Sequence, residues 1–426
     1  MADIAVIGAG YVGLTTAACF ADLGHDVTCA DIDEPRIAQL NRGVVPIVEV
    51  GLDALVRDGL ESQRLRFVVG AANAVRGAEF VYLCVPTPQG NDGSANLRYI
   101  EAAVREIGSE LEGQAVVVNK STVPVGSTRV VERALGRDDV SVVSNPEFLR
   151  EGAAVHDFLH PDRIVIGCDH QSAAARVVSL YIGVTAPIIV TDPASAETIK
   201  YASNAYLATK ISYVNAIAAV CEAVDADVDD VLLGMGYDKR IGHEFLRPGP
   251  GFGGSCLPKD THALVHIANR AGYPFELLRG VMAVNEEQFE RVVAKVRGLV
   301  GRSPGETLEG LKVAVWGLTF KARTHDTRDS PAVRIIQRLL ASGASVAAYD
   351  PVVRSPLEGI EPDNDPYSVC DGADVLAVLT EWDDFRWLDF EKVAQLMVSP
   401  RVVDARNLLD KAMLERKGFA YTGIGR

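Results

Sequence analysis

The segment that ends at Cys256 carries the residue types best suited to covalent chemistry. Four glycines and two prolines precede the cysteine in RPGPGFGGSC, residues 247–256. Glycines let the backbone adopt positive φ angles and approach a ligand closely. We expect a helix from Pro258 to Ala271 just after Cys256, and a helix N-terminus favours the nucleophilic thiolate. Although most cysteines are buried and inert, this glycine-rich setting predicts that Cys256 is a nucleophile.

The segment GAGYVG, residues 8–13, has the spacing of a phosphate-binding turn. It follows a predicted strand and opens a predicted helix, and this context gives the pattern its meaning. Gly8 would permit the tight turn, Gly10 would let the backbone approach a pyrophosphate, and Gly13 would let helix and strand pack closely. The helix N-terminus would add N–H groups and a partial positive charge for the phosphates. The segment therefore predicts a dinucleotide site.

Asp31 indicates which dinucleotide is bound. It ends the next predicted strand, where a carboxylate can accept both ribose hydroxyls and would repel a 2′-phosphate. Arg36 could accept such a phosphate, but we predict NAD rather than NADP. A nucleophilic thiol in an NAD enzyme implies that a thiohemiacetal loses a hydride to give a thioester, which water hydrolyses to an acid. A dehydrogenase that converts an alcohol to a ketone does not need such a thiol.

The elements that must position these residues form two α/β lobes. From residue 3 to about residue 190, short Val- and Ile-rich runs alternate with amphipathic stretches, which is typical of a mostly parallel sheet covered on both faces. The strand-like runs are DIAVIG, HDVTCAD, EFVYLCVPTP, QAVVVNK, SVVSNPE, DRIVIG and PIIVTD. After a Gly- and Pro-rich break at residues 301–305, the alternation returns in LKVAVWGLTF, ASVAAYD, ADVLAVLT and RVVDAR.

Between the lobes the pattern is helical. It begins with PASAETIKYASNAYLATKISYVNAIAAVCEAV from Pro193, a helix long enough to connect two lobes or to pair two subunits. We therefore predict an α/β fold in which two Rossmann-like, doubly wound parallel-sheet lobes are joined by a long central helix and a helical middle domain. The domains are expected at 1–191, 192–300 and 301–426.

Composition limits the partners and the compartment. The 426-residue chain has a formal net charge of −15, which gives no reason to expect nucleic-acid or anionic-membrane binding. Met1 leads directly into the strand pattern of DIAVIG, which leaves no room for a signal peptide, and we expect a cytoplasmic protein. The odd number of cysteines, seven, fits reduced thiols. Those expected to be structural are Cys19, Cys29, Cys84, Cys168, Cys221 and Cys370.

On six motifs the chain resembles the UDP-glucose/GDP-mannose dehydrogenase family. The motifs are GAGYVG at 8–13, KSTVPVG at 120–126, NPEFLREG at 145–152, ETIKYASNAYLATKISYVN at 197–215, RIGHEFLRPGPGFGGSCLPKD at 240–260 and GLTFKARTHDTRDSP at 317–331. The resemblance covers essentially the whole chain. It implies two successive NAD-dependent oxidations at a sugar C6, through an enzyme-held aldehyde and a thioester. It also implies a nucleotide-sugar-binding C-terminal domain, and a homodimer built on the central helix.

The resemblance assigns catalytic roles to six residues. They are Cys256, Lys200, Asn204, Asp260, Glu147 and Thr122. Lys200 and Asn204, four residues apart, would share one helix face. Lys200 would stabilise the developing alkoxide and hold a catalytic water, with Asp260 as its partner or as a base. Glu147 would serve thioester hydrolysis, and Thr122 would orient the water.

The same resemblance implies binding residues for the cofactor and the substrate. The cofactor contacts are Gly8, Gly10, Tyr11, Val12, Gly13, Asp31, Arg36, Thr87, Ser121, Glu151, Lys259 and Arg328. The substrate contacts are Phe148, Leu149, Lys200, Asn204, Arg240, Phe252, Gly253, Phe320, Lys321 and Arg406. Arg240 would reach the substrate from the neighbouring subunit. His262 and His266 have a metal-compatible spacing but no third ligand, so we predict no metal site.

Two questions stay open at this level. The first is the nucleotide: Arg240-Ile241-Gly242 resembles the UDP-glucose branch of the family, whereas Leu257 also resembles the GDP-mannose branch. We favour UDP-glucose, with GDP-mannose and dTDP-glucose as alternatives. The second is the class of protein. A two-electron NAD-dependent hydroxyacid dehydrogenase or a non-enzymatic NAD sensor would share the N-terminal motif, but neither explains Cys256.

Overall fold

The computed structural model describes residues 1–88, 90 and 96–426. The chain forms two compact units, which are described separately. Unit 1 consists of residues 1–203 and 262–272, and unit 2 consists of residues 204–261 and 273–426. The domain bounds expected from the sequence stay a prediction.

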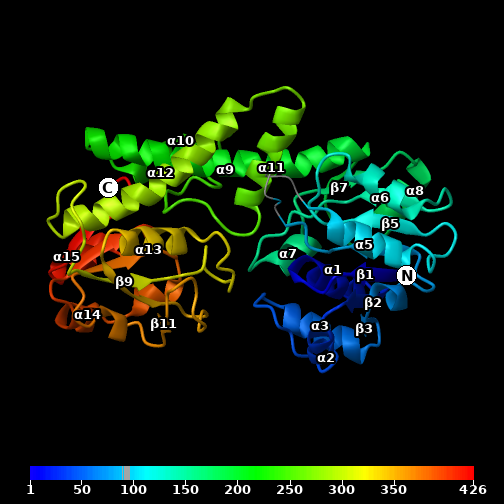
Figure 1. Cartoon of the computed structure of the whole chain (residues 1–426), viewed down its shortest axis with the longest axis horizontal. Helices are drawn as coiled ribbons and strands as arrows, with labels where there is room; N and C mark the ends of the chain where they lie inside the picture. Colours follow the sequence, from blue (N-terminus) through cyan, green and yellow to red (C-terminus); the bar gives the residue numbers. More distant parts are fainter. Residues whose placement is uncertain (89, 91–95) are drawn as a thin grey trace. The chain divides into compact units, whose positions relative to one another are not determined.

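Unit 1 is built on an eight-stranded sheet with the order β3-β2-β1-β4-β5-β6-β7-β8 (Figure 1). The strands are β1 (Asp3–Ile7), β2 (Asp26–Asp31), β3 (Leu65–Val69), β4 (Phe80–Leu83), β5 (Val116–Asn119), β6 (Ser141–Ser144), β7 (Ile164–Gly167) and β8 (Ile188–Thr191). All neighbours are parallel except β6 and β7, which pair antiparallel at Ser144 and Gly167. The mostly parallel sheet is thus confirmed, although β3, an edge strand containing the exposed Arg66, is an addition to the predicted strands.

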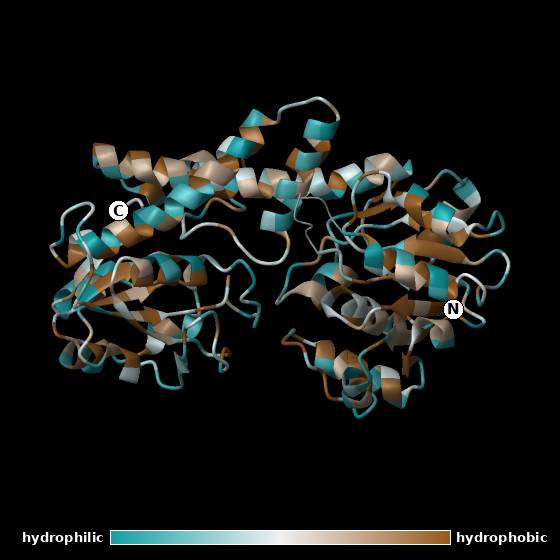
Figure 2. Cartoon of the chain, viewed as in Figure 1, coloured by the Kyte–Doolittle hydropathy of each residue, from teal (hydrophilic) through white to brown (hydrophobic). Residues whose placement is uncertain are grey.

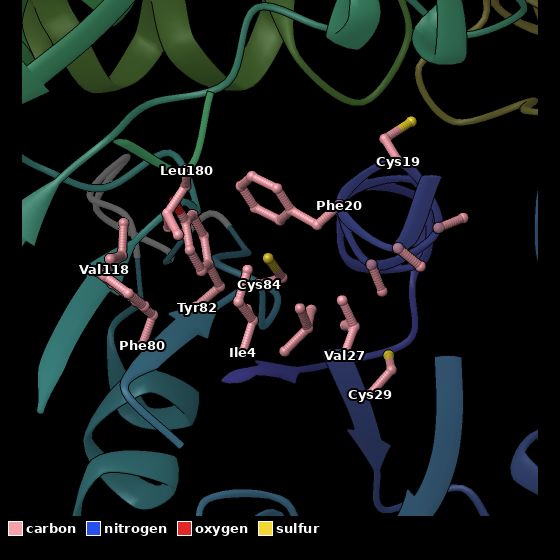
Figure 3. Packing of buried hydrophobic residues seen from close by; sticks show 14 of the residues in the cluster. Ile4, Cys19, Phe20, Val27, Cys29, Phe80, Tyr82, Cys84, Val118 and Leu180 are labelled. Carbon is pink, nitrogen blue, oxygen red and sulfur yellow. The ribbon is translucent and has the colours of Figure 1, made fainter. Parts of the chain in front are cut away.

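Successive residues of each central strand enter different cores, because side chains alternate between the faces of a sheet. Ile4 and Val6 pack with α1 on one face, and Ala5 and Ile7 pack with α5 on the other. Figure 3 shows the first core, in which Phe20 and Tyr82 lie with ring centroids 5.0 Å apart. The helices are α1 (Tyr11–Asp22), α2 (Glu34–Leu40), α3 (Leu52–Glu61), α4 (Ala71–Ala74), α5 (Arg98–Ile107), α6 (Ser127–Leu135), α7 (Ala154–Leu159) and α8 (Gln171–Ser179).

Unit 2 contains a six-stranded, fully parallel sheet with the order β11-β10-β9-β12-β13-β14. The strands are β9 (Lys312–Trp316), β10 (Ser345–Tyr349), β11 (Pro362–Asp363), β12 (Val375–Val378), β13 (Arg401–Asp404) and β14 (Ala420–Thr422). The helices within it are α10 (Val228–Gly236), α12 (Glu276–Leu299), α13 (Pro331–Ala341), α14 (Phe390–Leu396) and α15 (Lys411–Arg416). Figure 2 shows hydrophobic colour gathered on the strands, whereas the helices also carry polar residues. Both predicted α/β lobes are therefore confirmed.

Two helices contribute residues to both units. They are α9 (Pro193–Val224), which has the predicted bounds, and α11 (Leu257–Arg270), which begins directly after Cys256 as expected. Among the described helices, α9 is the one whose length and mean hydropathy would suit a membrane span. However, Glu197 and Lys200 are both buried on α9, and buried charged groups with partners are typical of a helix that packs inside a protein.

Candidate active site

The GAGYVG turn has the geometry that a dinucleotide requires. Gly8 has a φ of +102°, and a Cβ there would lie 2.6 Å from the Cys84 carbonyl oxygen. A Cβ on Gly13 would lie 1.8 Å from the Gly8 carbonyl oxygen, so strand and helix pack as closely as predicted. At Gly10, by contrast, a Cβ would meet nothing within 4 Å. The first N–H groups of α1 have no carbonyl partner within the helix and are available to a phosphate.

The Asp31 carboxylate closes the turn and keeps capacity for a ribose. Its oxygens accept the N–H of Ala9 at 2.7 Å and that of Asp33 at 3.1 Å. An ionised carboxylate has about four acceptor positions, so two remain for hydroxyl groups. Arg36 lies 3.6 Å from Asp31 and 3.7 Å from Asp33. Because these carboxylates already engage the guanidinium, Arg36 is poorly placed to recruit a 2′-phosphate.

The segment with Ser121 and Thr122 is held against the strand ends of unit 1. Ser121 Oγ donates to the Val85 carbonyl at 2.7 Å, and Thr87 Oγ1 donates to the Thr122 carbonyl at 2.7 Å. Lys120, just before them, is buried with its ammonium 3.2 Å from Asn145 Oδ1. The structure thus brings Thr87, Ser121 and Thr122 into one bonded group at the carboxyl ends of β4 and β5, where ligands of open α/β sheets bind.

Glu147 and Lys200 form a buried ion pair in unit 1. Lys200 Nζ lies 2.9 Å from Glu147 Oε1, and both side chains are almost fully buried. Burial alone would raise the pKa of Glu147, but the Lys200 charge and hydrogen bond, together with the Leu149 N–H and Lys120, outweigh it and hold that pKa below its usual value. Glu147 is therefore ionised at neutral pH, and it places an acceptor beside the ammonium group.

Phe148, Leu149 and Glu151 follow Glu147 on the same loop. The Phe148 ring lies under two cations, 5.4 Å from Lys200 Nζ and 3.7 Å from the Arg163 guanidinium carbon. The loop is fixed at its far end by Glu49, whose carboxylate accepts the N–H groups of Gly152 and Ala154 at 2.7 and 2.9 Å. Tyr11 of the GAGYVG turn also donates to Glu49. Burial and the Glu49 carboxylate raise the pKa of Tyr11, which therefore stays protonated and remains a donor.

The glycine-rich segment before Cys256 packs closely against the loop after β9 in unit 2. A Cβ on Gly253 would lie 2.1 Å from the Asp329 carbonyl oxygen, and one on Gly254 would lie 2.8 Å from the Phe320 ring. The Gly254 N–H donates to the Arg328 carbonyl at 3.1 Å. These glycines are required because the backbone touches the loop after β9.

Side chains of α9 and α12 hold the same segment from the other side. Asn285 accepts the Phe252 N–H at 2.8 Å and donates to the Phe252 carbonyl at 3.1 Å. Gln288 donates to the Gly249 carbonyl at 2.7 Å, while Asn215 accepts the Gly249 N–H at 2.9 Å. All three amides are buried. The backbone that leads to Cys256 is thus held by hydrogen bonds at Gly249, Phe252 and Gly254.

Cys256 itself stands at the first turn of α11. Its carbonyl accepts the Asp260 N–H at 2.9 Å, so Cys256 directly precedes α11 and accepts a helical hydrogen bond at its beginning. Ser255 Oγ lies 3.6 Å from its sulfur. Asp260 is fully buried and is held by Asn204 Nδ2 at 2.6 Å and Lys259 Nζ at 2.7 Å. Unit 2 thus groups the predicted nucleophile with Asn204, Lys259 and Asp260.

The other six cysteines have the structural setting that the sequence predicts. Cys19, Cys29, Cys84, Cys221 and Cys370 are buried, and Cys168 is partly buried. Burial raises the pKa of the Cys84 thiol to about 12, so it is not a thiolate at neutral pH. Cys19, Cys29 and Cys84 belong to the buried apolar cluster of unit 1, part of which Figure 3 shows.

The C-terminal residues predicted to bind substrate form a second group in unit 2. Arg406 donates to the Phe320 carbonyl at 2.8 Å and the Leu379 carbonyl at 3.0 Å, and Lys321 Nζ lies 5.5 Å from the Phe320 ring centroid. Arg328 and Arg240 are largely exposed. Arg328 pairs with Asp326, and Arg240 pairs with Asp238, each at 2.6 Å. The side-chain partner of Arg240 in the described part of the chain is thus its sequence neighbour Asp238 and not another predicted substrate residue of unit 2.

Sequence reasoning did not select several residues that position the site. They are Glu49, Lys120, Asn145, Glu197, Asn215, Asn285 and Gln288. Lys120, Asn145 and Glu197 begin recognised motifs and Asn215 ends one, so motif membership was a signal for these four. The polar Asn285 and Gln288 lie among the buried apolar residues of α12, and such a polar pair on the inward face of a helix would have been the signal there. Glu49 offered no local signal.

Comparison with known families identifies the chain. Residues 2–185 match the NAD binding domain of the UDP-glucose/GDP-mannose dehydrogenase family, residues 194–287 its central domain and residues 314–411 its UDP binding domain. The chain belongs to this family. The prediction of NAD as the cofactor is confirmed by the first of these matches.

Similar proteins span the whole chain. UDP-glucose 6-dehydrogenase of Rhizobium meliloti (strain 1021) is 47% identical over 438 residues, which cover 99% of each protein. UDP-glucose 6-dehydrogenase TuaD of Bacillus subtilis (strain 168) is 45% identical over 436 residues, which cover 100% of this chain and 94% of that protein. The structure of a UDP-glucose dehydrogenase from the hyperthermophilic archaeon Pyrobaculum islandicum superposes with a TM-score of 0.91 at 37% identity, covering 100% of this chain and 98% of that one.

Proposed function

We propose that this member of the family oxidises the C6 alcohol of UDP-glucose to a carboxylate, forming UDP-glucuronate and two NADH per turnover. The observation that carries the proposal is the placement of Cys256 at the start of α11 beside the buried Asp260. The full-length relatives named above act on UDP-glucose, as their names state. A two-electron hydroxyacid dehydrogenase would leave this cysteine without a role.

NAD would be held by the GAGYVG turn and Asp31, and it would accept the hydride in both oxidations. The open space at Gly10 and the N-terminus of α1 suit a pyrophosphate. The acceptor capacity left on Asp31 suits the ribose hydroxyls. Thr87, Ser121 and Glu151, with Lys259 and Arg328, are the further contacts that we propose.

The covalent part of the reaction belongs to Cys256. Its thiolate adds to the C6 aldehyde and forms a thiohemiacetal, and the second oxidation converts this adduct to a thioester. Water then attacks the thioester carbon, and the carboxylate product leaves as the thiol is regenerated. Asp260 would accept the proton that the attacking water loses, because it stands one turn after Cys256 on α11. Asn204 and Lys259 hold its carboxylate in place.

The polar groups around the carbonyl oxygen and the water have separate tasks. Lys200 would stabilise the negative charge that develops on oxygen, and Asn204, one turn later on α9, would donate a second hydrogen bond. The ionised Glu147 keeps the Lys200 ammonium in place. Glu147 and Thr122 would also orient the water that hydrolyses the thioester.

Substrate recognition would use the UDP binding domain and the loop after Glu147. Lys321 and Arg406 offer positive charge, which suits a diphosphate, and Phe320 offers an apolar face. Phe148, Leu149, Phe252 and Gly253 are proposed to complete the site. GDP-mannose and dTDP-glucose remain the alternatives to test.

We also propose a homodimer that forms through α9, in the cytoplasm. The aromatic side chains of Tyr206 and Tyr213 on this helix are 62% and 53% exposed, and Val220 and Val224 are 54% and 66% exposed. A row of exposed large hydrophobic residues on one helix favours burial against another copy. Arg240 would then serve the site of the partner subunit. Sedimentation equilibrium tests the assembly, since a Tyr213→Glu variant should shift the protein to the monomer.

The stoichiometry of NADH formation tests the reaction. Purified protein would be supplied with NAD and, separately, with UDP-glucose, GDP-mannose or dTDP-glucose. We expect two NADH per UDP-glucose consumed, with release of the acid. One NADH per sugar, with a free aldehyde or ketone as product, would exclude the thioester route, and turnover of GDP-mannose alone would correct the substrate.

A Cys256→Ser variant tests the nucleophile. Acid formation should fall on the order of a thousandfold or more, because the thioester cannot form, while UDP-glucose binding measured by calorimetry stays within about threefold. Cys168→Ser is the matched control, since Cys168 is the other partly buried cysteine and should leave turnover unchanged. Undiminished acid formation by Cys256→Ser would eliminate the proposed role.

A further inference from the structure

Glu197 is a buried acid in the second turn of α9 to which the proposed reaction gives no task. It is 2% exposed. Its carboxylate accepts three hydrogen bonds from the start of α6: the Gly126 N–H at 2.6 Å, the Thr128 N–H at 2.9 Å and the Thr128 hydroxyl at 2.8 Å. Burial raises the pKa of Glu197, and the bonds from Thr128 and Gly126 oppose that rise. The contact joins two helices that are far apart along the chain.

These bonds replace a local helix cap. The residue at the N-cap of α6 is Gly126, which has no side chain to satisfy the first N–H groups of the helix. Such groups normally bond to the side chain of a Ser, Thr, Asp or Asn at that position. Here the acceptor comes from α9 instead. Glu197 therefore ties the start of α6 directly to α9.

The segment that ends at Gly126 carries Thr122. At its beginning the N–H groups of Lys120 and Ser121 both donate to the Leu83 carbonyl at 3.1 Å, and in its middle Thr87 holds the Thr122 carbonyl. Glu197 provides the anchor at its end. The segment is thus tied to the sheet at one side and to α9 at the other.

The same turn of α9 carries Lys200, three residues after Glu197. The beginning of α9 is packed tightly as well, because a Cβ on Gly167 of β7 would lie 2.4 Å from the Ala196 Cβ. The backbone of α9 at Ala196 is therefore packed closely against β7. Any shift of Glu197 relative to Gly126 changes the distance between Thr122 and Lys200.

We propose that Glu197 is a positioning residue for hydrolysis of the thioester. It sets the register between α9 and the 120–126 segment, and so places Thr122 and Lys200 around one water molecule. This inference rests on the proposed function. It predicts that a change at Glu197 slows the hydrolytic step and leaves the binding of NAD and sugar largely unaffected.

The test is a Glu197→Gln variant, which keeps the shape but turns one of the two acceptor atoms into a donor. We expect kcat to fall on the order of tenfold to a hundredfold, as small misplacements of catalytic groups do, while both KM values stay within about threefold. A rapid first release of two NADH per site should precede the slow phase. Intact-mass measurement should then find a sugar thioester on Cys256.

The control separates positioning from general stability. Asp389 caps α14 in unit 2 by accepting the N–H groups of Glu391 and Lys392, so Asp389→Ala also loses a helix cap. It should lower Tm without changing kcat. If Glu197→Gln lowers Tm but turns over at the wild-type rate, or if its slow phase occurs without a thioester on Cys256, Glu197 is only a structural cap and the inference is wrong.

A measurement without substrate keeps the inference testable if the proposed reaction fails. Hydrogen exchange in Glu197→Gln should accelerate in peptides covering 120–128 and 196–203 and remain unchanged in β9 and β12. Unchanged exchange in both peptides would overturn the positioning role. Absence of NADH from wild-type protein with any of the three sugars would instead overturn the proposed function.

Discussion

The sheets of both units place a glycine after one strand and an aspartate after the next, but the two aspartates differ in what they bind. In unit 1, Gly8 follows β1 with its φ at +102°, and Asp31 after the next strand accepts the N–H of Ala9 at 2.7 Å. In unit 2, Gly317 follows β9 with its φ at +96°, and Asp350 accepts the N–H of Leu318 at 2.7 Å. Strand, glycine, second strand and acid therefore recur in both lobes.

The difference lies in what else each carboxylate binds. Asp31 is partly accessible, with 12% of its side chain exposed. Asp350 is fully buried, and it also accepts the Thr319 hydroxyl and the Trp382 indole N–H, each at 3.3 Å. One acid has capacity for a ribose, and the other has become part of the core. The shared frame of a dinucleotide turn thus does not specify a dinucleotide site.

The helix after the turn differs as well. In unit 1, α1 begins at Tyr11, directly after the turn, so its N-terminus faces the phosphate position. In unit 2, α13 begins only at Pro331, and the intervening residues include Phe320, Lys321 and Arg328. The loop replaces the helix N-terminus and presents side chains, which fits the match of this lobe to a UDP binding domain.

The largest effect should come from removing the buried acid. Asp350→Ala leaves Thr319, Leu318 and the Trp382 indole without their acceptor, and the free energy of unfolding should fall by about 3–5 kcal/mol. Urea denaturation measures it, with the exposed Asp363→Ala as control. A loss below about 1 kcal/mol would mean that Asp350 is not an essential part of this core.

Removing the accessible Asp31 should affect NAD binding more than stability. Asp31→Ala should raise the Kd for NAD on the order of tenfold to a hundredfold, because hydrogen bonds to a charged group are lost, while stability changes less than in Asp350→Ala. Calorimetric titration with NAD measures this. Asp33→Ala removes the cap of α2 and is the matched control; equal losses of NAD affinity in both variants would contradict the ribose role of Asp31.

A smaller effect on stability should follow from removing one hydrogen-bond donor to Asp350. Trp382→Phe removes one donor to Asp350 and keeps most of the apolar surface, so unfolding should become easier by about 1 kcal/mol. NAD affinity should not change, because Trp382 is not one of the proposed NAD contacts. If the variant bound a second NAD per chain in calorimetry, then the closure by Trp382 would be what prevents this lobe from binding a dinucleotide.

The smallest expected effects are two pH trends of opposite sign. The pKa of Glu147 is lowered, so its stabilisation is present above its unfolded pKa and is lost as pH falls through the folded pKa. Burial raises the pKa of Asp404, so its contribution is present at low pH and is lost as pH rises. The destabilisation in Glu147→Gln should therefore be larger at pH 7 than at pH 4, and that in Asp404→Asn should be smaller. Urea denaturation at both pH values decides it, and parallel trends would contradict the assignment.

The sequence predicts the parts of this molecule that depend on local pattern. The long α9 and the turn at Gly8 could be located because periodicity and glycine spacing are properties of short segments. The strands β3, β11 and β14 are edge strands that were not predicted. β11 and β14 have only two and three residues, too few to show a periodic pattern. Glu49 and Glu197 could not be predicted as anchors, because each bonds to N–H groups about 70 to 105 residues away, and no local signal reports such a distance.

The family resemblance predicted more of the site than the pattern did. It gave Lys200, Asn204, Glu147 and Asp260 as catalytic residues, with Asp260 as the partner of Lys200 or as a base. The pairs that the structure describes are Lys200 with Glu147 at 2.9 Å and Asp260 with Asn204 at 2.6 Å. The role of each residue in catalysis stays a prediction, since the bonds show proximity and charge but not turnover. Arg240 shows the limit, because its proposed place lies in another subunit.

The anchoring of the glycine segment by Asn285 and Gln288 bears on how related genes are interpreted. Both amides lie on α12, outside the 240–260 motif by which such chains are recognised. A paralogue could retain every residue of that motif but carry an aliphatic residue at position 285. It would still be recognised by the motif, but the backbone before its cysteine would lack the hydrogen bonds that Asn285 makes to Phe252. Searches for active homologues should therefore require these two amides together with the cysteine.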